Sequence, residues 1–205
     1  MVSVIIPYKE DRGFLKQCIY SIQAQTQNVE IIESVSHGSV GYNFNKGLEK
    51  ANGEFVKYVC EDDFLPPTAI EDLVDGIGNS QWVCANAYLY KTWYNVPLKI
   101  ERSVVKPLED LLLNYTIHGG TTLYRTAILK EIGGMDVTLW TGEEYDMNLK
   151  LIFMGHIPAY IDKEVYYYRG WTHQKSRTFK RARPELRRAE LEKIKARYDK
   201  RNSTV

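Results

Sequence analysis

Cysteine is scarce in this chain, with three among 205 residues. Cys18, Cys60 and Cys84 are odd in number, widely spaced and embedded in apolar segments. A disulfide framework or a zinc cluster is normally recognised by more cysteines at closer spacing. We therefore expect three buried, reduced thiols.

The chain also lacks a long hydrophobic run. Its apolar start has no basic leader and ends at Pro7, after which the charged residues 9–12 follow. A signal sequence and a membrane span both need longer apolar stretches. We therefore expect a protein on the cytoplasmic side, at most peripheral to a membrane.

Internal repeats and low-complexity linkers are missing too, so nothing in the sequence favours a second domain. A length of 205 residues suits one domain with a substantial core. We expect that domain over residues 1–180 and a basic helical tail over residues 181–205.

The net charge of +1 hides an uneven distribution. Residues 175–205 contain twelve Lys or Arg and four Asp or Glu, whereas the rest of the chain contains fifteen and twenty-two. A basic tail can lie on an anionic membrane, where each basic side chain contributes about 1 kcal/mol. A solvated helix face is the alternative, and Leu191, Ile194 and Tyr198 recur at helical spacing that would also suit docking on the protein's own body. We expect no nucleic-acid partner.

Hydrophobic periodicity alternates between strand and helix patterns in the first half of the chain. Strands are expected over residues 2–6, 29–35, 54–60 and 82–90, and helices over residues 11–24, 42–51 and 68–77. This alternation predicts an α/β fold with a mostly parallel sheet and helices on both faces. The second half is less regular, with helices expected over residues 106–114 and 125–131 and from residue 142, and a strand-like stretch over residues 119–124.

Three adjacent carboxylates, Glu61, Asp62 and Asp63, follow the third expected strand and are stopped by Pro66 and Pro67. We call these three residues the acidic cluster. Mg²⁺ and Mn²⁺ take oxygen ligands, often one or two carboxylates, and leave positions to water and phosphates. The competing explanation is an Asp N-cap before a helix that opens on proline.

Polar side chains follow the first and second expected strands as well. Pro7, Tyr8 and Glu10 follow the first, and Ser36 follows the second. Ligands of open α/β sheets bind at the carboxyl ends of the strands. The convergence of these positions with the acidic cluster favours a metal–diphosphate site, in which Tyr8 either stacks on a nucleobase or is an ordinary packed tyrosine.

Six short segments between residues 2 and 178 follow one another in a characteristic order. They are residues 2–7; residues 45–47 with 51–54; residues 58–66; residues 132–136; residues 142–151; and Tyr168, Arg169, His173 and Ser176. They look like, respectively, the opening strand, the Asn-x-Gly and Ala-x-Gly-Glu stretch, the DXD region, the Gly-Gly-Phe-Asp turn, the Glu-Asp catalytic helix and the C-terminal metal loop of one enzyme family. In this order the chain resembles the family 2 glycosyltransferases, inverting enzymes of the Rossmann-like GT-A fold.

The resemblance implies metal-dependent, inverting transfer of a hexose from a nucleotide-diphosphate donor, with a UDP-sugar as first choice. Asp63 would be the main ligand of Mn²⁺ or Mg²⁺, with Glu61 and His173 as further ligands, and the metal would stabilise the leaving diphosphate. An imidazole ligand would favour Mn²⁺. Donor contacts are implied for Pro7, Tyr8, Glu10, Ser36, Asn45, Lys46, Glu61, Asp62, Lys175 and Arg177, the last two on phosphate oxygens.

The resemblance also implies a general base on the helix that begins near residue 142. Glu144 occupies the place of the family's catalytic Asp, and Glu143 competes with it for removing the proton of the acceptor hydroxyl. The competing explanation for these acids is a favourable place at a helix N-terminus. Acceptor contacts are expected from Gly120, Thr121, Trp140 and Asp146, and the acceptor is a glycan or another lipid-linked or protein-linked hydroxyl.

The chain departs from the family pattern at two places. Ser36 and His37 stand where an acidic pair usually reads the uracil edge, and the first Asp of the DXD pattern is displaced to Cys60 or replaced by Glu61. GDP and dTDP sugars therefore stay open. Two other functions also stay open: a nucleotidyltransferase acting on sugar phosphates, and a non-catalytic sugar-nucleotide-binding or membrane-associated adaptor.

Overall fold

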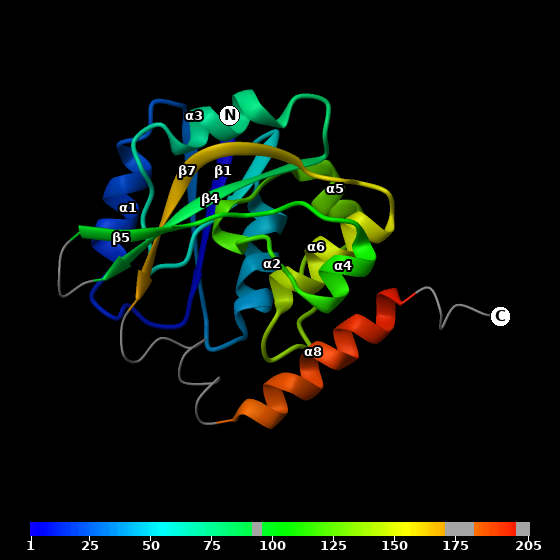
Figure 1. Cartoon of the computed structure of the whole chain (residues 1–205). Coiled ribbons are helices and arrows are strands. Elements are labelled where there is room, and N and C mark those ends of the chain that lie inside the picture. The colour runs from blue at the N-terminus through cyan, green and yellow to red at the C-terminus, as the bar shows by residue number, and fades with distance from the viewer. Residues whose placement is uncertain (92–95, 171–182, 200–205) are drawn as a thin grey trace.

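The computed structural model describes residues 1–91, 96–170 and 183–199 (Figure 1). Its strands are β1 (Val2–Tyr8), β2 (Val29–Val35), β3 (Phe55–Tyr58), β4 (Trp82–Lys91), β5 (Val96–Glu101), β6 (Leu123–Arg125) and β7 (Ala159–Gly170). Its helices are α1 (Leu15–Gln23), α2 (Val40–Lys50), α3 (Ala69–Ile77), α4 (Leu108–Leu113), the 3₁₀ turn η1 (Gly119–Thr121), α5 (Thr126–Glu131), α6 (Glu143–Phe153) and α8 (Pro184–Tyr198).

The strands form one mixed sheet in the order β2-β1-β3-β6-β4-β5, with β7 paired to β4. β1 runs parallel to β2 and β3, and β7 runs parallel to β4. β6 is antiparallel to both β3 and β4, and β5 is antiparallel to β4. The longest pairings, β1 with β2 and β4 with β7, are parallel, so the sheet is mostly parallel as predicted.

The sheet is covered on both faces. Val4 and Ile6 of β1 belong to a core with the apolar side chains of α1 and α3, whereas Ile5 packs in a second core with α2, α4, α5, α6 and α8. Strands buried on both faces read as continuous apolar runs, as β1 does. At Gly47 of α2 a Cβ would lie 2.4 Å from Cγ2 of Ile5, so this helix can approach the sheet only with glycine there.

Three predicted elements differ from the structure. α1 begins at Leu15 because the Asp11 carboxylate accepts the Gly13 and Leu15 amides, at 2.8 and 3.3 Å, and holds a turn before the helix. The stretch 119–124 is divided between η1 and β6. The segment containing Tyr168 and Arg169, predicted as a metal loop, is the end of the long strand β7, which the sequence patterns did not reveal.

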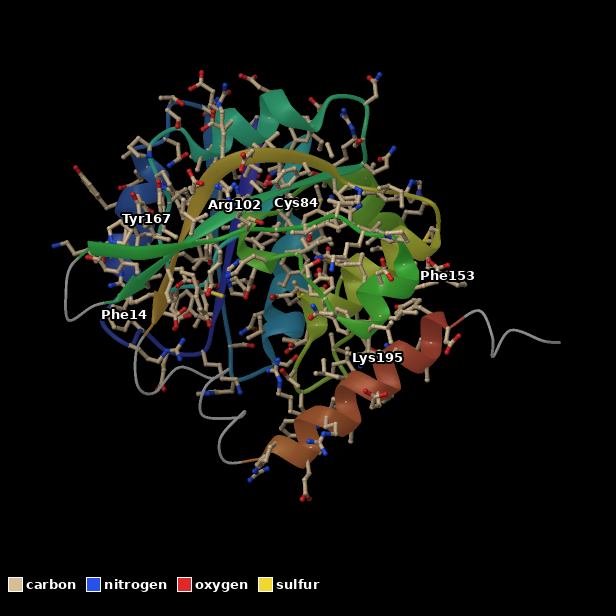
Figure 2. The ribbon with its side chains drawn as sticks, in the orientation of Figure 1. Phe14, Cys84, Arg102, Phe153, Tyr167 and Lys195 are labelled. Atoms are coloured by element: carbon tan, nitrogen blue, oxygen red, sulfur yellow. The ribbon has the colours of Figure 1, made fainter. Side chains whose placement is uncertain are left out.

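The three thiols are reduced, as predicted. Cys18 and Cys84 are buried, and Cys84 lies near the middle of the molecule (Figure 2). Cys60 is half-buried at the end of β3. The prediction of a buried thiol therefore holds for Cys18 and Cys84 and not for Cys60, which directly precedes the acidic cluster.

The basic tail forms α8, whose apolar stripe packs on the domain. Ile194 is fully buried and Tyr198 nearly so. From the sequence, the tail could either contact a membrane or dock on the protein's own domain. In the structure the apolar stripe docks on the domain. Among the described residues, none of the helices has both the length and the apolar character needed to cross a bilayer.

Candidate functional site

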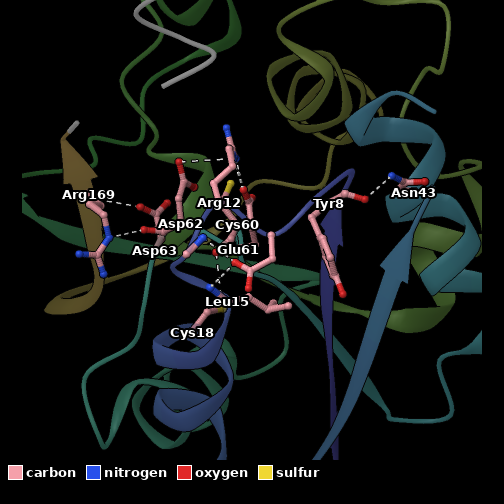
Figure 3. Close-up of polar contacts among 12 residues, drawn as sticks. Tyr8, Arg12, Leu15, Cys18, Asn43, Cys60, Glu61, Asp62, Asp63 and Arg169 are labelled. Carbon is pink, nitrogen blue, oxygen red and sulfur yellow. Dashed lines mark hydrogen bonds and ion pairs between the residues drawn. The ribbon is translucent and has the colours of Figure 1, made fainter. Parts of the chain in front are cut away.

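The acidic cluster lies in a tight turn at the carboxyl end of β3 (Figure 3). The Asp63 amide donates to the Cys60 carbonyl over 3.1 Å and closes the turn. All three carboxylates are buried, with 4%, 5% and 2% of Glu61, Asp62 and Asp63 exposed. Buried acids need partners, because an unpaired buried charge is strongly unfavourable.

Asp63 is held by two donors. The Tyr166 hydroxyl donates to its Oδ2 and the Arg169 amide donates to its Oδ1, both over 2.7 Å. Burial and the neighbouring Asp62 raise the pKa of Asp63 well above its ordinary value, although both hydrogen bonds lower it. Asp63 is therefore fixed in orientation at a point where a cation would relieve the charge repulsion.

Arg169 connects the turn to β7 and α1. Its Nε donates to the Asp62 carbonyl over 2.6 Å, and its Nη2 donates to the Gln17 side chain. Its guanidinium lies 4.6 Å from the ring centroid of Phe14 and 5.1 Å from that of Phe64. Hydrogen bonds and aromatic faces on both sides fix the guanidinium, and with it the acidic turn.

Glu61 pairs with an arginine, whereas the resemblance implied that it would bind a metal ion. The Arg12 guanidinium forms an ion pair and hydrogen bonds with Oε1 of Glu61, and lies 3.9 Å from Oδ2 of Asp62 (Figure 3). The group whose ligand atoms lie within 4.8 Å of one another consists of Cys60, Asp62 and Asp63. The predicted ligands were Asp63, Glu61 and His173. The structure pairs Glu61 with Arg12 and groups Asp63 with Cys60 and Asp62, and metal binding stays a prediction.

These three side chains could hold a divalent cation. Two carboxylates suit a hard ion such as Mg²⁺ or Mn²⁺, and sulfur is a soft ligand that adds affinity for softer metals. Burial and Asp63 raise the pKa of Cys60 well above its ordinary value, and the Tyr58 hydroxyl lies 2.8 Å from its sulfur. The thiol is thus protonated unless a metal displaces the proton.

The ends of β1 and β2 meet beside this turn, as predicted. The Asn43 side chain of α2 donates to the carbonyls of Tyr8 and Ser36, at 2.9 and 3.1 Å, and joins the two strand ends. The Tyr8 hydroxyl donates to Glu33 over 2.8 Å, and burial together with this contact raises the pKa of Tyr8 to about 12. Pro7 is buried in β1, whereas Glu10 is exposed.

Two predicted donor contacts lie elsewhere. Asn45 exchanges two hydrogen bonds with the Met135 backbone, at 2.8 and 2.9 Å, and so holds the turn over residues 132–136. Lys46 pairs with Glu49 on the solvent face of α2, at 3.0 Å. Both side chains are committed to these partners, which argues against direct donor contact.

The two glutamates that open α6 face different surroundings. Glu144 lies against η1, where a Cβ on Gly119 would be 2.3 Å from its Oε1. Glu143 is buried beside α2, with its Cγ 3.6 Å from the position of a Cβ on Gly41. The negative charge of Glu144 raises the pKa of Tyr58 and of Cys60, and that of Glu143 raises the pKa of Tyr58. Glu144 is the glutamate that packs on η1, whose Gly120 carbonyl accepts a hydrogen bond from Lys57 of β3.

Lys57 connects the acidic turn with α6 and was missed by the sequence analysis. It is fully buried in β3, and its ammonium donates to the carbonyls of Gly120 and Tyr58. Burial lowers its pKa to about 7, against the opposing influence of Cys60, Asp63 and Glu144. Lys57 also lies 5.1 Å from the centroid of the Tyr166 ring, whose hydroxyl binds Asp63, and Glu144 packs against Gly119 beside the Gly120 carbonyl that accepts from Lys57. The available signal was a lysine within an otherwise apolar strand.

Most of the predicted acceptor contacts are internal. Gly120 packs on the Tyr166 ring, and the Thr121 hydroxyl donates to the His118 carbonyl over 2.7 Å. Asp146 is 5% exposed and bound by α8, whereas Trp140 is 66% exposed. Trp140 is the one of the four predicted residues with a broadly accessible side chain, and the other three are corrected to structural positions.

Three predicted residues, His173, Lys175 and Arg177, lie outside the described residues, so their metal and phosphate roles stay predictions. A cavity of about 490 Å³ lies between the turn over residues 132–136, α6 and the end of α8. No residue of the acidic cluster lines it. The cavity is therefore separate from the candidate site.

Comparison with known proteins gives sequence and structural relatives, although no family model matches the chain. The chain is 26% identical over 201 residues to an uncharacterized glycosyltransferase of Rickettsia conorii and 25% identical over 199 residues to one of Rickettsia typhi. Each match covers 80% of this chain, but the chain spans only 33% and 62% of those two proteins.

Among solved structures, residues 1–349 of S. aureus TarS in complex with UDP match with a TM-score of 0.70 and 18% identity, covering 100% of this chain and 67% of that one. The chain shares its fold with TarS. The TarS complex with UDP-GlcNAc matches with a TM-score of 0.69, covering 97% of this chain and 67% of that one. The predicted single α/β domain of GT-A-like fold is confirmed, and the likeness to glycosyltransferases is supported. Membership of family 2 and inversion stay predictions.

Proposed function

We propose that this chain is a metal-dependent, inverting glycosyltransferase of the hexosyltransferase type. The observation that carries the proposal is the set of contacts that links Asp63 to Glu144: the Tyr166 hydroxyl binds Asp63, and Lys57 lies 5.1 Å from the centroid of the Tyr166 ring. Lys57 donates to the Gly120 carbonyl, next to Gly119, against which Glu144 packs. A cation ligand and a base held at one strand end are what glycosyl transfer from a nucleotide diphosphate requires. The names of the sequence relatives support the same activity.

The donor site is built from the ends of three parallel strands. Cys60, Asp62 and Asp63 would hold Mn²⁺ or Mg²⁺, which supplies Lewis-acid stabilisation of the leaving diphosphate when bound. Arg12 and Arg169 keep the turn in place from either side. Arg12 is 31% exposed beside the acidic turn, and its positive charge offsets the charges of Glu61 and Asp62.

The nucleotide is proposed to be UDP. The structures of TarS with UDP and with UDP-GlcNAc support this choice, because the fold is shared. The base would lie against Tyr8, whose hydroxyl is held by Glu33 at the edge of β2. Glu33 is an acid at this end of the sheet that the sequence analysis did not consider, and it offers an acceptor oxygen where Ser36 and His37 replace the family's acidic pair.

The base of the reaction is proposed to be Glu144. It would take the proton of the acceptor hydroxyl while that oxygen attacks the anomeric carbon opposite the diphosphate. Its place at the N-terminus of α6 favours the ionised form that a base needs. Trp140, just before the helix and exposed, is the proposed face for a glycan acceptor.

A panel of nucleotide-sugars tests the proposal, with slow hydrolysis and thermal stabilisation measured with and without Mn²⁺. Release of a nucleoside diphosphate from the nucleotide-sugar supports a transferase, whereas release of pyrophosphate from a nucleoside triphosphate supplied with a sugar phosphate would identify a nucleotidyltransferase. Glu144→Gln should keep donor binding and lose turnover by about a hundredfold or more. Glu143→Gln tests the competing candidate in the same assay. Unchanged turnover in Glu144→Gln would exclude Glu144 as the base, and donor binding without any turnover in the wild type would favour the non-catalytic adaptor.

A position on the cytoplasmic side, with peripheral contact to an anionic membrane, also stays a proposal. The apolar stripe of α8 is used inside the protein. Contact would therefore depend on the exposed basic residues of this helix, such as Arg188 and Lys193. The charge distribution of the tail supports it, at about 1 kcal/mol for each side chain near the surface.

A further inference from the structure

α8 packs across the start of α6, the helix that carries Glu143 and Glu144 (Figure 1). Gly142 precedes α6 with a positive φ of 81°. A Cβ there would lie 3.1 Å from Cδ1 of Ile194 and 3.4 Å from Cδ2 of Leu191. The apolar stripe of α8 is thus seated directly on the residue that begins the helix.

Polar contacts fix α8 on both sides of that point. The Trp140 amide donates to Glu190 over 3.3 Å, just before α6. Asp146 lies within the first turns of α6. Its Oδ1 accepts one hydrogen bond from the Arg197 guanidinium over 2.9 Å and another from the Tyr198 hydroxyl over 3.0 Å. The helix therefore holds the approach, the cap and the first turns of α6.

Arg197 also joins α6 to the turn over residues 132–136. Its second terminal nitrogen lies 2.8 Å from Oδ2 of Asp136. The neighbouring Met135 is bound to α2 by Asn45. At the far end of α6 the Phe153 ring lies 5.7 Å from that of Tyr198 (Figure 2). One guanidinium thus links α8 to two segments whose relative position decides where Glu144 points.

We propose that α8 is a positioning element for the catalytic helix, with Arg197 and Tyr198 as its positioning residues. The inference rests on the proposed function, in which Glu144 is the base. Asp146 lies two residues after Glu144, so its carboxylate fixes the rotation and axial position of the same turn. A displacement of about 1 Å at a reacting group can cost about a hundredfold in rate.

Stability alone does not explain the arrangement. The Arg197 side chain is 31% exposed, and a partly exposed ion pair contributes little net stability because solvent screens it. Its directional hydrogen bonds do restrict geometry. The three contacts on Asp146 and Asp136 therefore suit a role in placing α6 more than a role in holding the fold together.

The test compares Arg197→Ala, Arg197→Lys and Tyr198→Phe with Lys193→Ala, a control on the exposed side of α8. Hydrogen exchange of the amides over residues 139–150 and the kinetics of UDP-sugar hydrolysis are both measured. Arg197→Ala should lower kcat about tenfold or more with KM for the donor within about twofold, because Arg197 does not touch the donor. Exchange should rise in the first turns of α6.

The milder variants show how much of the loss in kcat each contact accounts for. They also keep the proposal testable if Arg197→Ala does not fold. Tyr198→Phe should lose less, since Arg197 still binds Asp146. Arg197→Lys should recover part of kcat, because one ammonium can reach one of the two aspartates. Unchanged kcat in both Arg197→Ala and Tyr198→Phe would overturn the proposal, even if their thermal stability fell.

The outcome is separable from the proposed function. If the wild-type chain neither transfers nor hydrolyses any nucleotide-sugar, the glycosyltransferase proposal fails. Faster exchange confined to residues 139–150 in Arg197→Ala would still support the positioning of α6 by α8. Exchange equal to wild type would overturn it.

Discussion

Lys57→Met should make this protein more stable near neutral pH, although it removes a buried hydrogen-bond donor. Burial lowers the pKa of Lys57 from 10.5 to about 7. Such a shift corresponds to about 5 kcal/mol of unfavourable free energy when the side chain is charged. Loss of the hydrogen bonds to the Gly120 and Tyr58 carbonyls costs about 1–3 kcal/mol in total, most of it at Gly120, because the contact with Tyr58 is long, at 3.3 Å. The balance is a gain of about 2–4 kcal/mol in the free energy of unfolding.

The pH dependence follows from the sign of the shift. The folded-state pKa lies below the unfolded value, so between about pH 7 and about pH 10.5 the unfolded chain binds more protons at this position. The stability of the wild type therefore rises with pH in this window, and the part due to Lys57 is lost as the pH falls through about 7. The variant has no titrating group there.

Urea unfolding of both proteins at about pH 6 and about pH 9 measures this effect, and the advantage of Lys57→Met should shrink by about 3 kcal/mol between the two. Lys46→Met, at a solvent-exposed lysine of α2, is the control and should show no such trend. The reasoning is refuted if the variant is less stable than wild type at the lower pH, or if the difference is the same at both.

Three further substitutions test other parts of the site and surface. Cys60→Asp places a third carboxylate among the candidate metal ligands, so the preference for Mn²⁺ over Mg²⁺ in donor binding should become smaller. Calorimetric titration of the donor with each ion measures this preference. The same preference for Mn²⁺ in the variant and the wild type would exclude Cys60 from the site. Arg169→Ala frees the acidic turn and should weaken donor binding about tenfold or more, while the exposed Arg102→Ala should not; equal affinities would mean that the turn holds its shape alone. Replacing Arg188 and Lys193 by Gln should reduce binding to anionic vesicles and leave donor hydrolysis unchanged, and vesicle binding equal to wild type would show that these charges only solvate α8.

The fold was largely predictable because its information is local. β1 is an apolar run of strand length, β2 is rich in Val and Ile, and α2 has an apolar face with the period of a helix. β7 was not predicted because its sequence is rich in charged residues and tyrosine, and β5 was not predicted because it is short and contains a proline. Both strands are defined by their pairing along β4. The Gly119–Thr121 turn was not predicted, because its shape depends on threonine hydroxyls. Each of these hydroxyls donates a hydrogen bond to the carbonyl three residues before it.

The acidic turn was also predictable, because strand ends in such sheets meet at one edge. What the sequence could not reveal is which side chains are already engaged. Glu61 is bound by Arg12, 49 residues away in the sequence, and Asp63 accepts a hydrogen bond from Tyr166, 103 residues away. Adjacent acids look equivalent in a sequence. Only their distant partners distinguish Asp63, the candidate metal ligand, from Glu61, which forms an ion pair.

The same argument explains the corrected roles of Asn45 and Asp146. Both are polar residues within family-like segments, and both are bound to partners far along the chain, Met135 and Arg197. Between them they join α2, the turn over residues 132–136, α6 and α8. A motif residue can therefore act by fixing the backbone that carries the chemistry. In this chain that backbone is the start of α6, where these distant contacts hold the turn that carries Glu144, the proposed base.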